Sequence, residues 1–389
     1  MKKIMILAAV SATFASAAHA QSSVTLYGLI DAGLTYVSNE ANRNSQVSSD
    51  GVTSGHAMVG LTGGNVQASR WGLRGVEDLG GGMKAIFTLE SGFNVANGKQ
   101  SVANTLFNRQ AFVGVSSNQF GTVTFGRQYD SVVDYLGPVS AAGTWGGTYF
   151  AHRGDNDNLN NTFSINNSVK YQSANYGGFS FSGLYGFSNQ AGGFANNRAY
   201  SVGAGYQNGG LQVGAAYLQL QGLDADNNNG AVQGLPASTV AALPGIQNQR
   251  TWGVGGSYTF GPAVVGGVFT QSRLQDRIGN ASVRYNNYEL SARYNLTPAL
   301  GLGAAYTYTQ ALRATPGTTS TNTGAGHWNQ FGLQADFSLS KRTDVYVEGV
   351  LQTGAQNQTG VNVTQVNGTD APSASKNQYV LTSGIRHRF

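Results

Sequence analysis

Residues 300–309 read Leu-Gly-Leu-Gly-Ala-Ala-Tyr-Thr-Tyr-Thr, so that an apolar side chain stands at every second position. Successive side chains of a β-strand point to opposite faces, and a period of two therefore predicts a strand with one apolar and one polar face. The same alternation returns at residues 24–31, 179–182, 251–259 and 330–339. These segments indicate an all-β fold.

The lengths of the segments and of their connections distinguish a membrane barrel from a soluble sheet. The alternating segments run for about 9–13 residues, close to the 9–11 that a tilted strand needs to cross a bilayer and longer than the 5–6 of common soluble strands. Tight turns are expected at 79–82, 118–121, 175–178, 208–210, 261–262, 295–299 and 340–342. Longer polar loops are expected near 38–66, 95–105, 130–163, 189–197, 222–248, 274–281, 314–325 and 355–376. Short turns at one end and long loops at the other are typical of outer-membrane barrels.

The number of connections predicts the size of the barrel. Seven turns and eight loops make 15 connections, and hence a 16-stranded antiparallel transmembrane β-barrel. Inside lipid every backbone group has to be paired, so the sheet has to close on itself. A barrel of about 16 strands leaves an aqueous channel, whereas a barrel of about eight is filled by its own side chains.

The two ends of the chain carry address signals. Residues 1–20 combine a basic start, an apolar run from Ile4 to Val10 and the small residues around His19, which is the pattern of a cleaved export signal. The alternative is a membrane anchor, but the run is shorter than the roughly 20 residues that a spanning helix needs. We therefore expect the barrel to occupy residues 21–389, inserted in the cell outer membrane after passage through the periplasm.

The last strand ends on an aromatic residue. Counting back in twos from Phe389 places Ile385, Leu381 and Tyr379 toward lipid, and Arg386 toward the lumen. A final strand with a terminal aromatic residue resembles the signal that the outer-membrane assembly machinery reads. The alternative is an ordinary last strand.

Composition excludes several kinds of chemistry. The chain has no cysteine, which rules out disulfides and thiolate metal sites. Only 11% of residues are charged, without the clustered lysine and arginine of a nucleic-acid-binding protein. The five histidines show no metal-ligand spacing, and the Gly-x-Gly strings lack the strand-to-helix context of a nucleotide site. We expect no enzyme activity, no metal and no cofactor.

Several short motifs carry a family resemblance. They are Ser-Arg-Trp-Gly-Leu-Arg-Gly at 69–75, Asn-Arg-Gln-Ala-Phe-Val-Gly at 108–114, Phe-Gly-Arg-Gln-Tyr at 125–129, Asn-Ser-Val-Lys-Tyr at 167–171 and the terminal Arg-His-Arg-Phe. In this order they resemble the Gram-negative trimeric general porins along nearly all of the chain. The resemblance implies a homotrimer in contact with outer-membrane lipid and lipopolysaccharide. It also implies a third loop, here about Asp130–Phe163, that folds into the barrel and narrows it.

Four basic residues and one acid are the candidate constriction residues. Arg70 and Arg74 alternate with Trp71 and Leu73, and Lys170 alternates in the same way with apolar neighbours, so all three are expected to face inward. The opposite facing would cost about 2–4 kcal/mol for a charge in mid-membrane. The resemblance places arginines that face the third loop at the positions of Arg70 and Arg109. The alternative is a lumenal charge that serves only solvation.

The loop that should oppose these arginines has lost its acids. Where the family commonly has Pro-Glu-Phe-Gly-Gly-Asp, residues 143–148 read Gly-Thr-Trp-Gly-Gly-Thr, and a third family arginine is also missing near Ser164, which Lys170 is expected to replace in part. Among the remaining acids of the loop, Asp134 is expected to reach the lumen. Asp155 and Asp157 lie in an asparagine-rich stretch and are expected on a solvated limb.

These features predict a water-filled channel for passive diffusion of small hydrophilic solutes and ions, with a preference for anions. Arginines in a narrow passage concentrate anions and repel cations. Six inward acids could dilute that preference, namely Asp31, Glu90, Glu289, Asp336, Asp344 and Glu348. A substrate-specific channel, a surface adhesin and a barrel hydrolase are the alternatives.

Overall fold

The computed structural model describes residues 22–41, 54–223, 227, 229–233, 246–276, 281–314, 326–354 and 363–389. The predicted export signal at 1–20 lies outside the described residues. The strands are antiparallel throughout: β1 (Ser23–Ala41), β2 (Gly55–Gly63), β3 (Arg70–Gly80), β4 (Met83–Gly92), β5 (Gln110–Ser117), β6 (Gly121–Gln128), β7 (Ile165–Gln172), β8 (Phe179–Gly186), β9 (Arg198–Asn208), β10 (Leu211–Gln221), β11 (Ile246–Phe260), β12 (Ala263–Asp276), β13 (Ser282–Asn295), β14 (Leu300–Ala314), β15 (Gly326–Ser338), β16 (Thr343–Gly354) and β17 (Asn377–Arg388).

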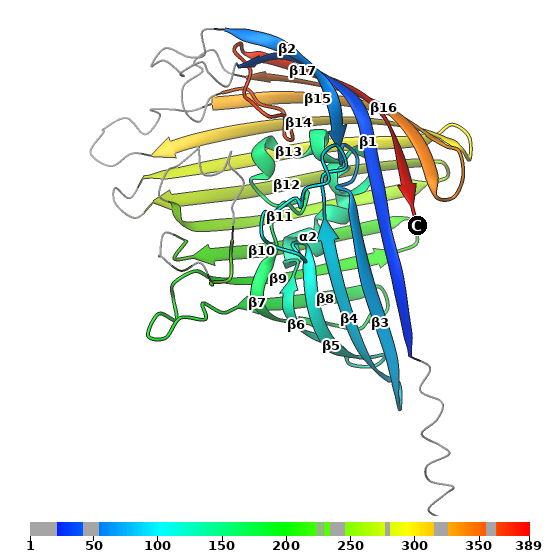
Figure 1. Ribbon diagram of the computed structural model, residues 1–389, viewed down its shortest axis with the longest axis vertical. Helices are drawn as coiled ribbons and strands as arrows, with labels where there is room; N and C mark the ends of the chain where they lie inside the picture. The colour runs from blue at the N-terminus through cyan, green and yellow to red at the C-terminus, as the bar shows by residue number, and fades with distance from the viewer. Residues whose placement is uncertain are drawn as a thin grey trace, which may run out of the picture.

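The strands form a closed barrel of 16 positions (Figure 1). Strand β1 closes the ring by pairing with β17, for example Leu29 with Arg388. Its other edge is shared by two segments. Strand β2 pairs with β1 from Ala32 to Ala41, and strand β3 pairs with β1 from Ser23 to Leu29. Strands β2 and β3 are therefore two pieces of one barrel strand, which confirms the predicted count.

The interruption between β2 and β3 is held by a carboxylate. Asp31 accepts hydrogen bonds from the backbone N–H groups of Val66 and Gln67, each at 2.8 Å. The segment between β2 and β3 is therefore bound to β1. The predicted loop at 38–66 was wrong in this region, since β2 lies inside it. Alternation of Val59 and Leu61 with glycine and threonine forms this strand, but the surrounding serine, glycine and asparagine obscured it.

The two ends of the barrel differ as the connection lengths predict. Short turns such as Gly261-Pro262 join neighbouring strands at one end, and the strand ends that flank the longer connections lie at the other end, to the left in Figure 1. The wall also varies in height: β3 to β8 have 8–11 residues, whereas β9 to β17 have 11–15.

The outer surface is apolar and the inner surface is polar. Leu26, Val59, Leu290 and Leu333 are each more than half exposed, as side chains that face lipid have to be in an isolated barrel. In the last strand Tyr379, Leu381 and Ile385 are exposed and Arg386 is buried, which confirms the predicted facing. Among the described residues, no helix is long and apolar enough to cross a membrane.

Candidate pore-lining site

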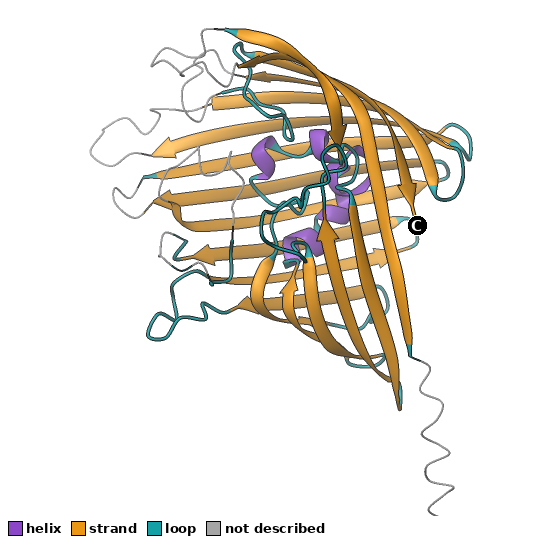
Figure 2. Ribbon diagram, viewed as in Figure 1, coloured by secondary structure: helices purple, strands orange, loops and turns teal. Residues whose placement is uncertain are grey.

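The third loop, residues 129–164, joins β6 to β7 and contains all the short helical turns of the described chain (Figure 2). They are α2 (Ser131–Tyr135), η2 (Gly137–Val139), η3 (Ala142–Gly146), η4 (Thr148–Phe150) and η5 (Arg153–Asp155). Asp130 caps α2 by accepting a hydrogen bond of 2.7 Å from the N–H of Val132. Burial raises the pKa of the Asp130 carboxyl to about 6, although the Asn158 side chain that bonds to it acts in the opposite direction.

Glycines on the inner face of the wall receive the aromatic side chains of this loop. A Cβ atom at Gly303 would lie 2.4 Å from the ring of Trp145, and one at Gly332 would lie 2.3 Å from the ring of Phe150. Gly203 leaves the same kind of space for Tyr135. The missing side chains of these glycines let the loop pack directly against the strands.

A buried charge cluster fastens the loop to the wall. The His152 ring lies 2.6 Å from Asp157 through Nδ1 and 3.2 Å from Glu289 through Nε2, and all three side chains are fully buried. Glu289, on β13, also accepts a 2.7 Å hydrogen bond from the N–H of Ala141. Burial by itself lowers the pKa of His152, but the two carboxylates outweigh it and raise that pKa to about 10. His152 is therefore positively charged at neutral pH.

The expectation of a solvated limb at Asp155 and Asp157 was wrong, because both side chains are buried. Asp155 accepts hydrogen bonds from the N–H groups of Asn160 and Thr162, and so holds the turn that leads back to β7. Burial, together with the nearby Asp157 carboxylate, raises the pKa of Asp155 to about 6. The polar side chains of this stretch are buried and form hydrogen bonds within the protein.

Arg109 is anchored on both sides. Its Nε donates to Glu90 at 2.8 Å, and its Nη2 donates to Asn161 of the third loop at 2.8 Å. The guanidinium also lies over the ring of Tyr129, 5.7 Å from its centroid. Arg109 therefore joins the wall to the loop, and most of its charge is balanced locally by Glu90.

Arg70 and Arg74 keep open charges on the same stretch of wall. Arg70 has Arg109 and Glu90 as electrostatic neighbours, and the Arg74 guanidinium lies 5.5 Å from the centre of the Tyr27 ring. Among the described residues, neither arginine forms an ion pair with a carboxylate. Both share the inward face with Gly72, as the alternation predicts.

Lys170 and Asp134 are brought together, at 2.5 Å between Nζ and Oδ2. Lys170 also donates to the backbone oxygen of Tyr129 at 2.9 Å. Burial raises the pKa of Asp134, while Lys170 opposes that rise. The pair ties α2 to β7, and Lys170 does not supply the free charge that would replace the missing arginine.

The six inward acids are all buried, and each carboxylate has a hydrogen-bond or ion-pair partner in the protein. Glu90 and Glu289 bind Arg109 and His152, as described above, and Asp31 binds the break after β2. The other three accept from arginine or glutamine: Asp336 from Arg386, Asp344 from Arg386 and Arg388, and Glu348 from Gln334.

The inward Arg293 was not predicted from the sequence. Arg293 on β13 lines a cavity of about 260 Å³ together with Thr144 and Trp145 of the third loop. It follows the alternation of its strand, since its neighbours Ala292 and Tyr294 are exposed on the outer face. The period of two was sufficient to find it, but no family motif drew attention to it.

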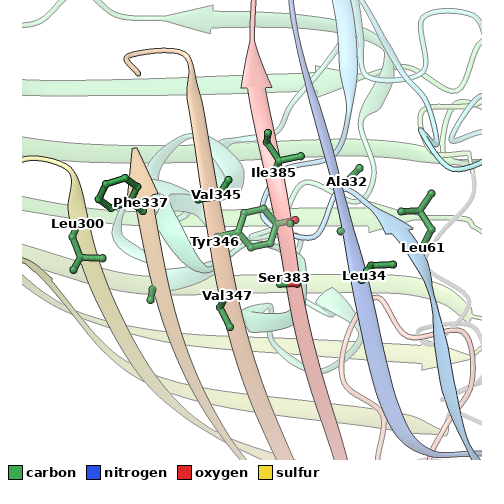
Figure 3. A pocket seen from close by; sticks show the side chains of 13 residues that line it. Ala32, Leu34, Leu61, Leu300, Phe337, Val345, Tyr346, Val347, Ser383 and Ile385 are labelled. Carbon is green, nitrogen blue, oxygen red and sulfur yellow. The ribbon is translucent and has the colours of Figure 1, made fainter. Parts of the chain in front are cut away.

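A second hollow lies on the outer face of the barrel, across β1 and β14 to β17 (Figure 3). It has a volume of about 620 Å³ and an apolar lining. Small side chains, among them Ala32, Ala335 and Ser383, line it together with larger ones such as Leu61 and Phe337. Its exposed apolar side chains, such as Leu34 and Ile385, face outward and away from the lumen.

A closed transmembrane barrel with a polar interior defines a membrane channel, and comparisons with known proteins agree. A family model described as Gram-negative porin matches residues 7–373. An outer membrane porin protein of Bordetella pertussis is 33% identical over 427 residues, covering 100% of both chains. Outer membrane porin protein 32 of Delftia acidovorans is 32% identical, and the match covers 78% of each chain. The solved structure of an anion-selective porin from Comamonas acidovorans has a TM-score of 0.71 and 25% identity, over 95% of this chain and 100% of that one.

The chain belongs to the Gram-negative porin family. It is an outer-membrane porin, a channel for passive diffusion, as the family resemblance of its motifs predicted. Family and fold are those of channels rather than of enzymes.

Proposed function

We propose that this porin prefers anions among the small ions and hydrophilic solutes that diffuse through it. The observation that carries the proposal is an imbalance on the inner wall. The six inward acids are buried and bonded, whereas Arg70 and Arg74 have no carboxylate partner among the described residues. Unpaired charge in a narrow passage with low-dielectric walls attracts counter-ions. The anion-selective porin that shares the fold supports the same choice.

The test is the reversal potential of the purified porin in a planar bilayer across a potassium chloride gradient. The expected sign corresponds to a higher permeability for chloride, and the preference should shrink at high salt because salt screens the arginines. A potential of the opposite sign would refute the proposal. Conductance that saturates with one class of solute would instead indicate a substrate-specific channel.

We further propose that three copies associate through the hollow over β1 and β14 to β17. Association within lipid depends on close packing, and small residues such as Ala335 and Ser383 allow a neighbouring wall to approach. Ala335→Phe should reduce the trimer fraction on unheated gels. The matched control, Ala215→Phe, places the same ring on the outer face of β10 and should leave the trimer intact.

The last strand is the proposed address for the assembly machinery. Phe389 and Gly28 exchange both backbone hydrogen bonds, at 3.0 and 3.1 Å. The last residue is therefore part of the seam, by which we mean the pairing of β1 with β17 that closes the barrel. Phe389→Ala retains those backbone bonds and removes only the ring. If the ring is part of the signal, the amount of porin in the outer-membrane fraction should fall while refolding of the purified protein in detergent stays normal.

A further inference from the structure

A row of three arginines crosses the outer face of the barrel near the end that carries the long connections. Arg250 on β11 lies directly opposite Arg273 on β12, and Arg273 lies directly opposite Arg284 on β13. All three side chains are exposed. We call Arg250, Arg273 and Arg284 the arginine row.

The neighbours of the row show that it faces outward. In β11, Trp252 and Val254 follow Arg250 at every second position and are exposed. The alternate positions face the third loop inside the barrel: Gln249 donates to the backbone oxygen of Asn156, and a Cβ at Gly253 would lie 2.8 Å from Leu136. The row is therefore on the surface that meets lipid and takes no part in lining the pore.

Two belts below the row place it relative to the membrane. The first is a chain of polar side chains, in which Trp252 donates to Gln271 at 3.3 Å, Gln271 to Asn286 at 2.9 Å and Asn286 to Gln310 at 3.3 Å. The second is aromatic, and its ring centroids lie 5.3 Å apart for Trp252 and Phe269 and 5.0 Å apart for Phe269 and Tyr288. Aromatic girdles mark the membrane interfaces of barrels, so the arginine row lies at headgroup level.

The row is electrostatically unsatisfied within the protein. Like charges directly opposite each other on neighbouring strands destabilise a sheet, and here two such pairs adjoin. Among the described residues, no carboxylate forms an ion pair with any of the three. The hydrogen bonds of the row include one from Arg250 to the neutral Gln219. An anion between the guanidinium groups would remove the repulsion.

We propose that the arginine row binds the phosphate groups of lipopolysaccharide in the outer leaflet. The planar guanidinium group binds phosphate through two parallel hydrogen bonds, and adjacent arginines suit a headgroup that carries more than one phosphate. The position fits a lipid rather than a soluble anion, because the aromatic belt below the row would contact the acyl chains. The proposal names a site for the lipid partner of the porin, and the arginine row is separate from the hollow proposed for trimer contacts.

The test measures binding of bis-phosphorylated lipid A to the folded porin in detergent micelles, by native mass spectrometry. The triple variant Arg250→Gln/Arg273→Gln/Arg284→Gln should bind about tenfold more weakly or worse, as expected when charge-assisted hydrogen bonds are lost. The control variant Lys99→Gln/Lys341→Gln/Arg342→Gln removes the same charge from exposed loop and turn positions and should bind as the wild type does. Equal binding by both variants would overturn the proposal.

Two further arms separate the sources of phosphate. Dephosphorylated lipid A should bind the wild type as weakly as lipid A binds the triple variant, and equal binding of both lipids would refute the phosphate contact. Inorganic phosphate at millimolar concentration should not displace lipid A, and displacement would show that the site takes a free anion. If the triple variant does not fold, Arg273→Gln alone removes the central charge. Conductance of the variants should stay unchanged, which keeps this test distinct from that of the pore.

Discussion

The inner wall of this porin uses charge in two opposite ways. Along β3 and the start of β5, Arg70 and Arg74 remain open to the lumen beside the paired Arg109. Where the third loop packs against β13, the charges of His152 and Asp157 from the loop and Glu289 from the wall are buried and satisfy one another. The first wall can act on passing ions, while the second can act only on the loop. A count of lumenal charges therefore overstates the charge that a passing ion meets, because the buried charges are balanced by their own partners.

The largest expected effect concerns the buried cluster. Glu289→Ala removes the carboxylate that pairs with His152 and accepts from Ala141, and truncation of one partner in a buried ion pair costs about 3–5 kcal/mol. The midpoint of urea unfolding in detergent should fall, and channel conductance should become noisy as the loop leaves the wall. Glu289→Gln keeps an acceptor for Ala141 and should recover part of the loss. Unaltered stability in Glu289→Ala would mean that the cluster does not hold the loop.

The same cluster should respond to alkali. The pKa of His152 is raised from 6.5 to about 10 in the folded protein, so its stabilising charge is fully present below about pH 6.5 and is lost as the pH rises through about 10. Loop fluctuations, seen as current noise, should therefore increase near pH 10 in the wild type. His152→Asn should be noisy at every pH. A wild-type recording that is flat from pH 7 to 11 would contradict the assignment.

A steric change should displace the loop by less. Gly303→Val places a side chain where the Trp145 ring lies, and overpacking of this kind costs about 1–3 kcal/mol. Ala304→Val adds the same bulk to the next position, on the outer face, and serves as the matched control. Thermal unfolding should separate the two variants. Equal unfolding midpoints for the two variants would show that Gly303 is not required for the packing of Trp145 against the wall.

The smallest energy belongs to the open wall, although it decides selectivity. Two unit charges about 8 Å apart in water interact by about 0.5 kcal/mol, with opposite sign for an anion and a cation, so each lost arginine should change the anion-to-cation ratio by about 1 kcal/mol, or roughly fivefold. Arg70→Gln/Arg74→Gln should shift the reversal potential toward cations. Glu90→Gln/Arg109→Gln removes a balanced pair and should shift it far less. If the second variant had the larger effect, Arg109 would be the selective residue in spite of its partner.

The repeating parts of the barrel were predictable because each follows from local chemistry. Turns such as Gly261-Pro262 and the facing of Arg70 depend only on neighbouring residues. Strand β2 was missed since its alternation is short and glycine-rich. The burial of Asp155 and Asp157, and the Glu90 partner of Arg109, depend on how a loop folds back across distant strands. No spacing in the sequence predicts these long-range contacts.

The seam between β1 and β17 also constrains how the molecule is made. The first strand of the barrel pairs with the last one, since Leu29 is the partner of Arg388. Until residue 389 arrives, one edge of the sheet exposes unpaired amides that can join another chain and cannot enter lipid. Closure and insertion therefore have to come late and together. A truncated chain would not be a smaller pore but an open sheet, and its fate would be aggregation or proteolysis in the periplasm.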